Sequence, residues 1–280
     1  MSAATHSPGA GYDRQVFIRW VTIALLLTWL VLPMIPLFIW SFSHGWFFPS
    51  LLPETYSLKA WRYLFSPTSG VMAALWDTIL ISAGATFLSV LVGVPAGRAL
   101  GQHQFRGKTL VELLILAPVI VPGIAVVLGI HVVFIRYGLA NSLIGVMLVH
   151  LIPTLPYMVL VMSGVFANYD ASYEQQARTL GAGPIRTWWY VTLPAILPGI
   201  IVGGLFAFLV SWSQYILTLL IGGGRVVTLP LLLFNFATAG RNDIAGAISM
   251  IYIVPGLFVL LLSARFLTGN SKAVGGFGQV

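Results

Sequence analysis

The chain has 280 residues, of which 58% are hydrophobic and only 8% are charged, and its formal net charge is +7. A soluble domain carries about a quarter charged residues, and a soluble chain of this length could not hide so much apolar surface, so the composition excludes an ordinary globular protein. The basic residues form no run or stripe, which excludes a nucleic-acid-binding surface, and the absence of cysteine excludes disulfides and thiolate metal sites.

Six apolar stretches follow one another along the chain, each about as long as the 20 residues that a membrane-spanning helix needs. We expect the spans at 20–42, 77–98, 112–136, 142–166, 195–220 and 243–265. The first stretch lacks the layout and cleavage site of a signal peptide, so we expect it to be retained. The sequence therefore predicts an all-α membrane protein, with a transmembrane domain at 19–268 between cytoplasmic tails at 1–18 and 269–280.

The basic residues predict the orientation of this domain, because Lys and Arg are enriched in cytoplasmic loops. Six spans place both termini on one side. Nine basic residues lie on that side, namely Arg14, Arg19, Arg98, Arg106, Lys108, Arg178, Arg186, Arg265 and Lys272. Five lie on the other side, namely Lys59, Arg62, Arg136, Arg225 and Arg241. We therefore expect both termini to be cytoplasmic and the aromatic-rich loop at 44–70 to lie along the outer membrane interface.

The cytoplasmic loop at 167–193 has the pattern of two short helices joined by a turn. Asp170 or Ser172 can cap the first helix, in which apolar residues recur at helical spacing. The glycines at 181–183 end it, since glycine enters left-handed backbone conformations without strain. Pro184 suits the first turn of a second helix that leads into the fifth span. A rigid helical element of this kind can fit a groove on a partner protein.

This loop resembles the "EAA" coupling loop of ABC importer permeases, in which Glu-Ala-Ala is followed by three residues, a glycine and, later, Ile-x-Leu-Pro. Aligned on Gly181, the loop has Gln175-Gln176-Ala177 at the Glu-Ala-Ala positions and Val191-Thr192-Leu193-Pro194 at the end. Gln175 replaces the motif glutamate, and Glu174 lies one residue earlier and can supply the carboxylate. The coupling residues that the resemblance implies are Glu174, Gln175, Gln176, Ala177, Leu180, Gly181, Pro184, Leu193 and Pro194.

The resemblance extends over about 71–268, and it is nearest to permeases for spermidine, putrescine, ferric iron and related small solutes. It implies a type I importer permease fold in a bacterial inner membrane and a polyamine-like substrate. It also implies three partners: an ATP-binding subunit dimer, a second and paralogous permease, and a periplasmic or extracellular solute-binding protein. The chain itself would be non-catalytic and would bind no cofactor, because ATP and magnesium belong to the partner ATPase.

Polar residues within the expected spans are candidates for the transport route. Ser211, Ser213, Gln214 and Tyr215 are expected near the middle of the fifth span, where polar groups must face a cavity or a partner. They can line a translocation pathway, or they can form hydrogen bonds between helices. His131 and His150 also allow two interpretations, structural hydrogen bonding or a proton relay.

Other features have simpler interpretations. The glycines at 93–101 and 199–203 recur every four residues, which favours close helix packing within the subunit or across a permease dimer. Segment 101–109 has five residues between its glycines, whereas a phosphate-binding loop has four, so we do not expect it to bind ATP. Asp77 and Glu112 are expected at span ends, where solvation is the simplest role, although Asp77 at the outer mouth could attract a cationic solute.

Two other classes of function compete with the permease. A secondary transporter would carry charged or broken helices at the membrane midplane and inverted repeats. An intramembrane enzyme would need a metal cluster or a nucleophile with its base. The six spans, the scarcity of charge within them and the loop at 167–193 favour the permease over both.

Overall fold

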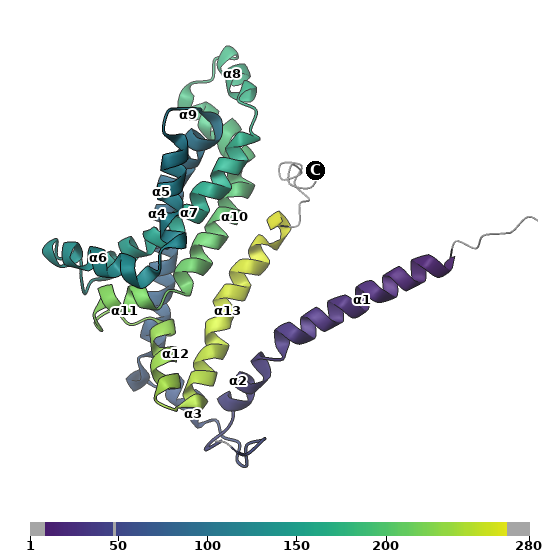
Figure 1. Cartoon of the computed structure of the whole chain (residues 1–280), viewed down its shortest axis with the longest axis vertical. Helices are drawn as coiled ribbons and strands as arrows, with labels where there is room; N and C mark the ends of the chain where they lie inside the picture. The colour runs from purple at the N-terminus through teal and green to yellow at the C-terminus, as the bar shows by residue number, and fades with distance from the viewer. Residues whose placement is uncertain (1–8, 47–48, 268–280) are drawn as a thin grey trace, which may run out of the picture.

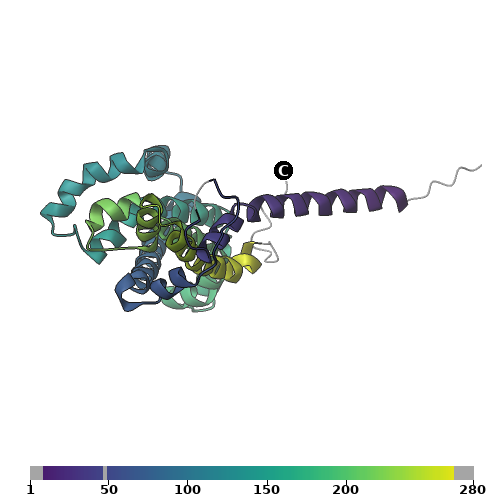
Figure 2. The same ribbon diagram turned by 90° about the horizontal axis from the view of Figure 1, so that it is seen from below.

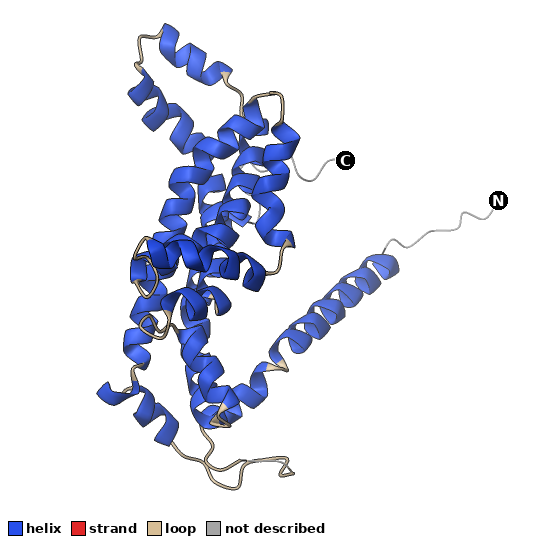
Figure 3. Ribbon diagram, turned by 60° about the vertical axis from the view of Figure 1, so that its left-hand side comes forward, coloured by secondary structure: helices blue, strands red, loops and turns tan. Residues whose placement is uncertain are grey.

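The computed structural model describes residues 9–46 and 49–267 of the chain. This part is built from helices and contains no β-sheet (Figure 3). The helices are α1 (Gly9–Val31), α2 (Met34–Ser41), α3 (Lys59–Leu64), α4 (Val71–Gln102), α5 (Lys108–Ile120), α6 (Gly123–Arg136), α7 (Leu143–Ala167), α8 (Ser172–Thr179), α9 (Pro184–Thr187), α10 (Leu193–Trp212), α11 (Ile216–Gly222), α12 (Leu229–Thr238) and α13 (Asn242–Leu267). The 3-10 helix η1 (Pro67–Ser69) and the π-helix η2 (Trp188–Thr192) complete them.

Four helical segments of the described part are long and apolar enough to cross a membrane, and two bent helix pairs raise the number to six. The fourth and sixth expected spans correspond to α7 and α13. The second is longer than expected at both ends, since α4 has 32 residues. Helix α1 already includes residues 9–18, which we assigned to the N-terminal tail. Residues 1–8 of that tail and the C-terminal tail at 269–280 lie outside the described residues.

The first and third spans are broken at proline. Between α1 and α2 the chain bends by 43° beside Pro33. Between α5 and α6 it bends by 104°, and Val121 before Pro122 is extended. Proline cannot donate a helical hydrogen bond and disfavours helical backbone in the residue before it. The third expected span, at 112–136, therefore consists of two helices, because α6 turns away from the axis of α5 (Figure 1).

Close helix packing defines the bundle of α4, α7 and α10. A side chain at Gly97 of α4 would collide with the Met162 side chain and lie 2.9 Å from the backbone of α7. Gly93 and Gly101 approach α7 in the same way, and Gly199 of α10 meets Val165 of α7. The expected glycine packing is thus within the subunit, and it joins the three helices into one unit.

The fifth span differs from its expected bounds of 195–220. Helix α9, η2 and α10 run continuously from Pro184 to Trp212 over 29 residues. The chain then leaves the helix at residues 213–215 and resumes as α11. The turn expected at Gly222–Arg225 is present, since α11 ends at Gly222 and both following glycines have positive φ.

The two ends of the bundle differ. Helices α8 and α9 stand at one end, whereas α2, α3 and the start of α13 meet at the other (Figure 1). The 44–70 loop, expected to lie along the membrane, belongs to this second end and contains α3 and η1. Helix α1 extends away from the bundle, as the view from below also shows (Figure 2). The end that carries α8 and α9 therefore presents a helical projection of its own.

Candidate functional site

The expected helix–turn–helix is present at 172–187, where α8 and α9 flank a glycine turn. The Asp170 carboxylate accepts a hydrogen bond from the Ser172 amide at 2.8 Å just before α8. At its end, the Ala182 amide donates to the Ala177 carbonyl at 3.0 Å, and Gly181 has a φ of +84°. This is the Schellman arrangement that stops a helix at glycine. The turn fixes the direction in which α9 leaves α8.

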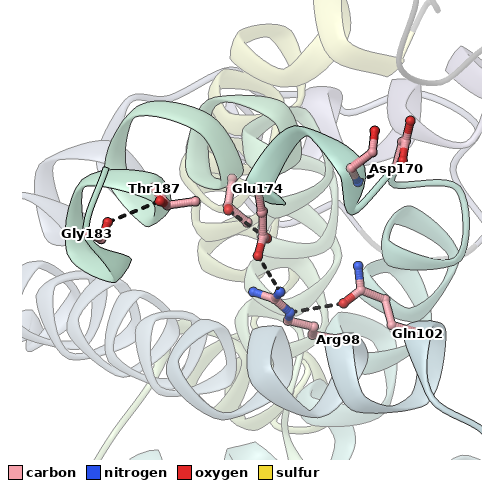
Figure 4. Close-up of polar contacts among 8 residues, drawn as sticks. Arg98, Gln102, Asp170, Glu174, Gly183 and Thr187 are labelled. Atoms are coloured by element: carbon pink, nitrogen blue, oxygen red, sulfur yellow. Dashed lines mark hydrogen bonds and ion pairs between the residues drawn. The ribbon is translucent and has the colours of Figure 1, made fainter. Parts of the chain in front are cut away.

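Glu174 anchors α8 to the bundle. Only 6% of this residue is exposed, and its carboxylate accepts hydrogen bonds from two helices. Arg98 at the end of α4 donates to Oε2 at 2.9 Å, and the Thr192 hydroxyl donates to Oε1 at 2.8 Å (Figure 4). Arg98 also donates through Nε to Gln102 at 3.0 Å. We call Arg98, Glu174 and Thr192 the anchor cluster.

The charges of the anchor cluster support one another. Burial raises the pKa of the Glu174 carboxyl, but hydrogen bonds from Arg98 and Thr192 outweigh it and hold that pKa below its ordinary value. Burial raises the pKa of the neighbouring Tyr169 phenol. Glu174 is therefore ionised at neutral pH and pairs with Arg98 as a charged group.

The predicted coupling residues divide into two groups. Gln175, Gln176, Leu180, Gly181, Pro184 and Pro194 are exposed, whereas Ala177 and Leu193 are half-buried. Glu174 stands apart, because its carboxylate is turned into the chain and not toward a partner. Sequence reasoning missed the pairing of Glu174 with Arg98 and Thr192, since no local pattern pairs residues that lie 76 and 18 positions apart. The exposed tip is apolar: Leu180 is 88% exposed and Ile185 is 75% exposed.

The predicted pathway residues lie where α10 ends at Trp212 and the chain leaves the helix before α11. Ser211 is buried and its hydroxyl lies 2.8 Å from Nδ1 of His150. Ser213 is exposed, and Gln214 and Tyr215 are half-buried. For Ser211 the structure thus favours the alternative of hydrogen bonding between helices.

The remaining candidate residues belong neither to the helix pair α8 and α9 nor to the end of α10. His131 is half-buried on α6, and Asp77 and Glu112 lie in the second turns of α4 and α5. Within residues 9–46 and 49–267, no three His, Asp or Glu side chains gather as metal ligands. The arrangement offers a docking element and a broken helix rather than a reaction centre.

A bundle of apolar helices that carries a rigid helical projection at one end is the architecture of a membrane permease subunit. The chain matches the family described as "binding-protein-dependent transport system inner membrane component" over residues 89–269, and it belongs to that family. It is 32% identical over 218 residues to the molybdenum transport system permease protein ModB of Mycobacterium tuberculosis, with 72% of this chain and 81% of that protein covered. It is 27% identical over 261 residues to the putrescine transport system permease protein PotI of Escherichia coli K12, with 88% and 91% covered.

The fold is similar to that of a solved bacterial ABC transporter involved in the import of the acidic polysaccharide alginate. The TM-score is 0.68 at 19% identity, over 93% of this chain and 99% of that one. The resemblance to ABC importer permeases and the type I permease fold are therefore confirmed. Subunits of this class do not hydrolyse ATP, which is the task of a separate ATPase. The chain is thus a non-catalytic, multi-pass subunit of an inner-membrane importer.

Proposed function

We propose that this chain forms half of the translocation pathway for a small solute and that α8 and α9 couple it to a separate ATP-binding subunit. The observation that carries the proposal is the pairing of an exposed apolar tip with a buried anchor. Leu180 and Ile185 project from the end of the bundle, while Glu174 ties the same helix pair to α4 and α10. An exposed apolar patch of this kind fits a groove on a partner.

The mechanism follows from where the anchor cluster lies. When ATP closes the two nucleotide-binding subunits, each coupling tip moves with its subunit. Glu174 then transmits the displacement to Arg98 on α4 and to Thr192, which leads directly into α10. The permease halves rock and expose the pathway to the binding protein, and hydrolysis resets them. Of the four predicted residues, we assign Ser213, Gln214 and Tyr215 to the pathway, whereas the buried Ser211 holds the end of α10 through its hydrogen bond to His150.

The expected partners complete this scheme. We assign two ATP-binding subunits to the end that carries α8, and a second, paralogous permease beside this chain. A periplasmic or extracellular solute-binding protein would dock at the opposite end. Helix α13 runs from that end toward the end with α8 (Figure 1), which supports termini on the cytoplasmic side. ATP and magnesium would be bound by the ATPase and not by this chain.

A polyamine-like cation is our first candidate substrate, because the alignment with the putrescine permease PotI covers 88% of the chain. A specific observation favours an oxyanion as the second candidate. The molybdenum permease ModB has the higher identity of the two relatives, at 32%. The outer side also carries more basic than acidic residues by our assignment, with five Lys and Arg against Glu54, Asp77 and Asp243. Stimulation of the ATPase by binding protein loaded with putrescine or with molybdate separates the two.

The coupling role is tested by charging the tip. We expect Leu180→Glu to abolish stimulation of the ATPase by the binding protein in the complex reconstituted in lipid, while the permease keeps its thermal stability. Phe105→Glu is the matched control, because Phe105 is an exposed apolar residue in the loop between α4 and α5 and not in the tip formed by α8 and α9. Unchanged stimulation in Leu180→Glu would remove the coupling role from α8 and α9.

A further inference from the structure

The break between α10 and α11 is held by side chains. Helix α10 ends at Trp212, and its last carbonyl accepts a hydrogen bond from the Tyr252 hydroxyl at 3.4 Å. The Gln214 carbonyl accepts one from the Thr218 hydroxyl at 3.3 Å. Non-helical backbone at membrane depth persists only where it is buried in protein or lines a water-filled cavity. At this break Ser213 is exposed while Ser211 and Thr218 are buried.

His150 of α7 bridges the two sides of this break. Its ring is buried, with 1% of the residue exposed. Nδ1 lies 2.8 Å from the Ser211 hydroxyl at the end of α10, and Nε2 lies 3.0 Å from the Thr218 hydroxyl in α11. One ring on a third helix therefore contacts both helices that the break separates.

The hydrogen bonds of Thr218 determine which ring nitrogen of His150 is the donor. The Thr218 hydroxyl has one proton, which it donates to the Gln214 carbonyl, so Nε2 of His150 must be the donor to Thr218. Nδ1 is then free to accept from Ser211. This network assigns a ring proton to Nε2. The series of hydrogen bonds from Ser211 through His150 and Thr218 thus ends on the Gln214 carbonyl, within the break between α10 and α11.

We propose that His150 is a positioning residue for transport: its ring ties both sides of the break to α7 and so fixes where Gln214 and Tyr215 lie along the pathway. The proposal rests on the proposed function, in which residues 213–215 border that pathway. Beside His150, the Thr154 hydroxyl donates to the His150 carbonyl and bonds to Ser89 of α4 at 2.8 Å. The turn of α7 that carries His150 is therefore tied to α4 as well.

The natural absence of cysteine allows a direct test with one reporter thiol at a time. Gln214→Cys places the reporter at the break and keeps the backbone carbonyl that accepts from Thr218, and Ser50→Cys in the outer loop is the control reporter. In the complete complex reconstituted in lipid, we would measure the rate at which a membrane-impermeant thiol reagent modifies this chain, read from its mass. The resting and the vanadate-trapped states give two rates, whose ratio reports how the break responds to the ATPase.

His150→Phe keeps a ring but loses both hydrogen bonds. We expect it to bring the ratio of the two modification rates of the break reporter about threefold to tenfold closer to one. This factor corresponds to the free energy of one or two hydrogen bonds between membrane helices. The ratio of the control reporter should not change. Thr218→Val removes the hydroxyl that bonds to His150 and to the Gln214 carbonyl without changing the side-chain volume, and it should act in the same direction. It replaces His150→Phe if that variant does not assemble. Independently, nitrogen NMR of labelled histidine should give one ring signal protonated on Nε2 that disappears in His150→Phe.

Each result decides a different point. A preserved ratio of the break reporter in both variants, or a ring protonated on Nδ1, overturns the role of His150 and leaves the pathway assignment standing. A break reporter that stays unreactive in both states shows that the break does not border the pathway, and then both proposals at this site fail. Coupling through Leu180 is measured separately and is unaffected by either outcome.

Discussion

Breaking the anchor cluster should release α8 from the bundle. We consider Glu174→Gln, which keeps an oxygen to accept from Thr192 but removes the charge that pairs with Arg98. Losing one partner of a fully buried pair costs about 3–5 kcal/mol, and an exposed pair contributes about 0–1 kcal/mol. The Arg98 side chain is 32% exposed and that of Glu174 is 9% exposed, so about 1–2 kcal/mol is expected here.

Amide hydrogen exchange of the 172–180 segment measures this loss directly. A cost of that size raises the population of the detached helix about fivefold to thirtyfold, and exchange should accelerate by the same factor. Arg98→Gln should have a larger effect than Glu174→Gln, because it leaves a buried carboxylate without a counter-charge. The double variant should lose less than the sum of the two. Asp243→Asn is the matched control, since it breaks the more exposed pair with Arg241 at the other end.

The pH dependence of this effect has a fixed sign. The pKa of Glu174 is lowered in the folded chain, so the pair stabilises α8 fully above the ordinary carboxyl pKa of about 4.3. The contribution is lost as the pH falls through the lowered folded value. The gap between native chain and Glu174→Gln should stay constant from neutral pH to about pH 5 and close only below it. Additive single variants, or a gap that widens on acidification, would refute the anchor.

Two further predictions concern glycines. Gly181→Ala should lower stimulated ATPase activity severalfold, since an L-residue at this positive φ costs about 1–2 kcal/mol. Gly183 has an ordinary φ and open space around it, so Gly183→Ala should leave that activity nearly unchanged. Equal effects of the two would contradict the turn. Gly97→Ala should destabilise the bundle by about 1–3 kcal/mol in thermal unfolding, because its Cβ meets the backbone of α7, whereas Gly129→Ala has open space. A stable Gly97→Ala would contradict the close packing of α4 on α7.

Sequence reasoning reached the parts of this fold that local physics decides. Apolar length predicts α7 and α13, and the turn after α8 follows from Gly181 and Pro184. Proline at 122 indicates a weak point in the third span, but the 104° bend depends on how α6 packs against α11. The pairing of Arg98 with Glu174 is invisible for the same reason, because only the packed bundle brings the two together.

The two polar clusters lie at opposite ends of one helix. Thr192 of the anchor cluster immediately precedes α10, and Ser211, which contacts His150, is the penultimate residue of that helix. A 20-residue helix spans about 30 Å, which is the thickness of the hydrocarbon core. Because Gly199 packs α10 closely on α7, displacement at Thr192 cannot be absorbed by loose packing along the way. If α8 is the coupling element, α10 is therefore the lever that carries its movement to the break.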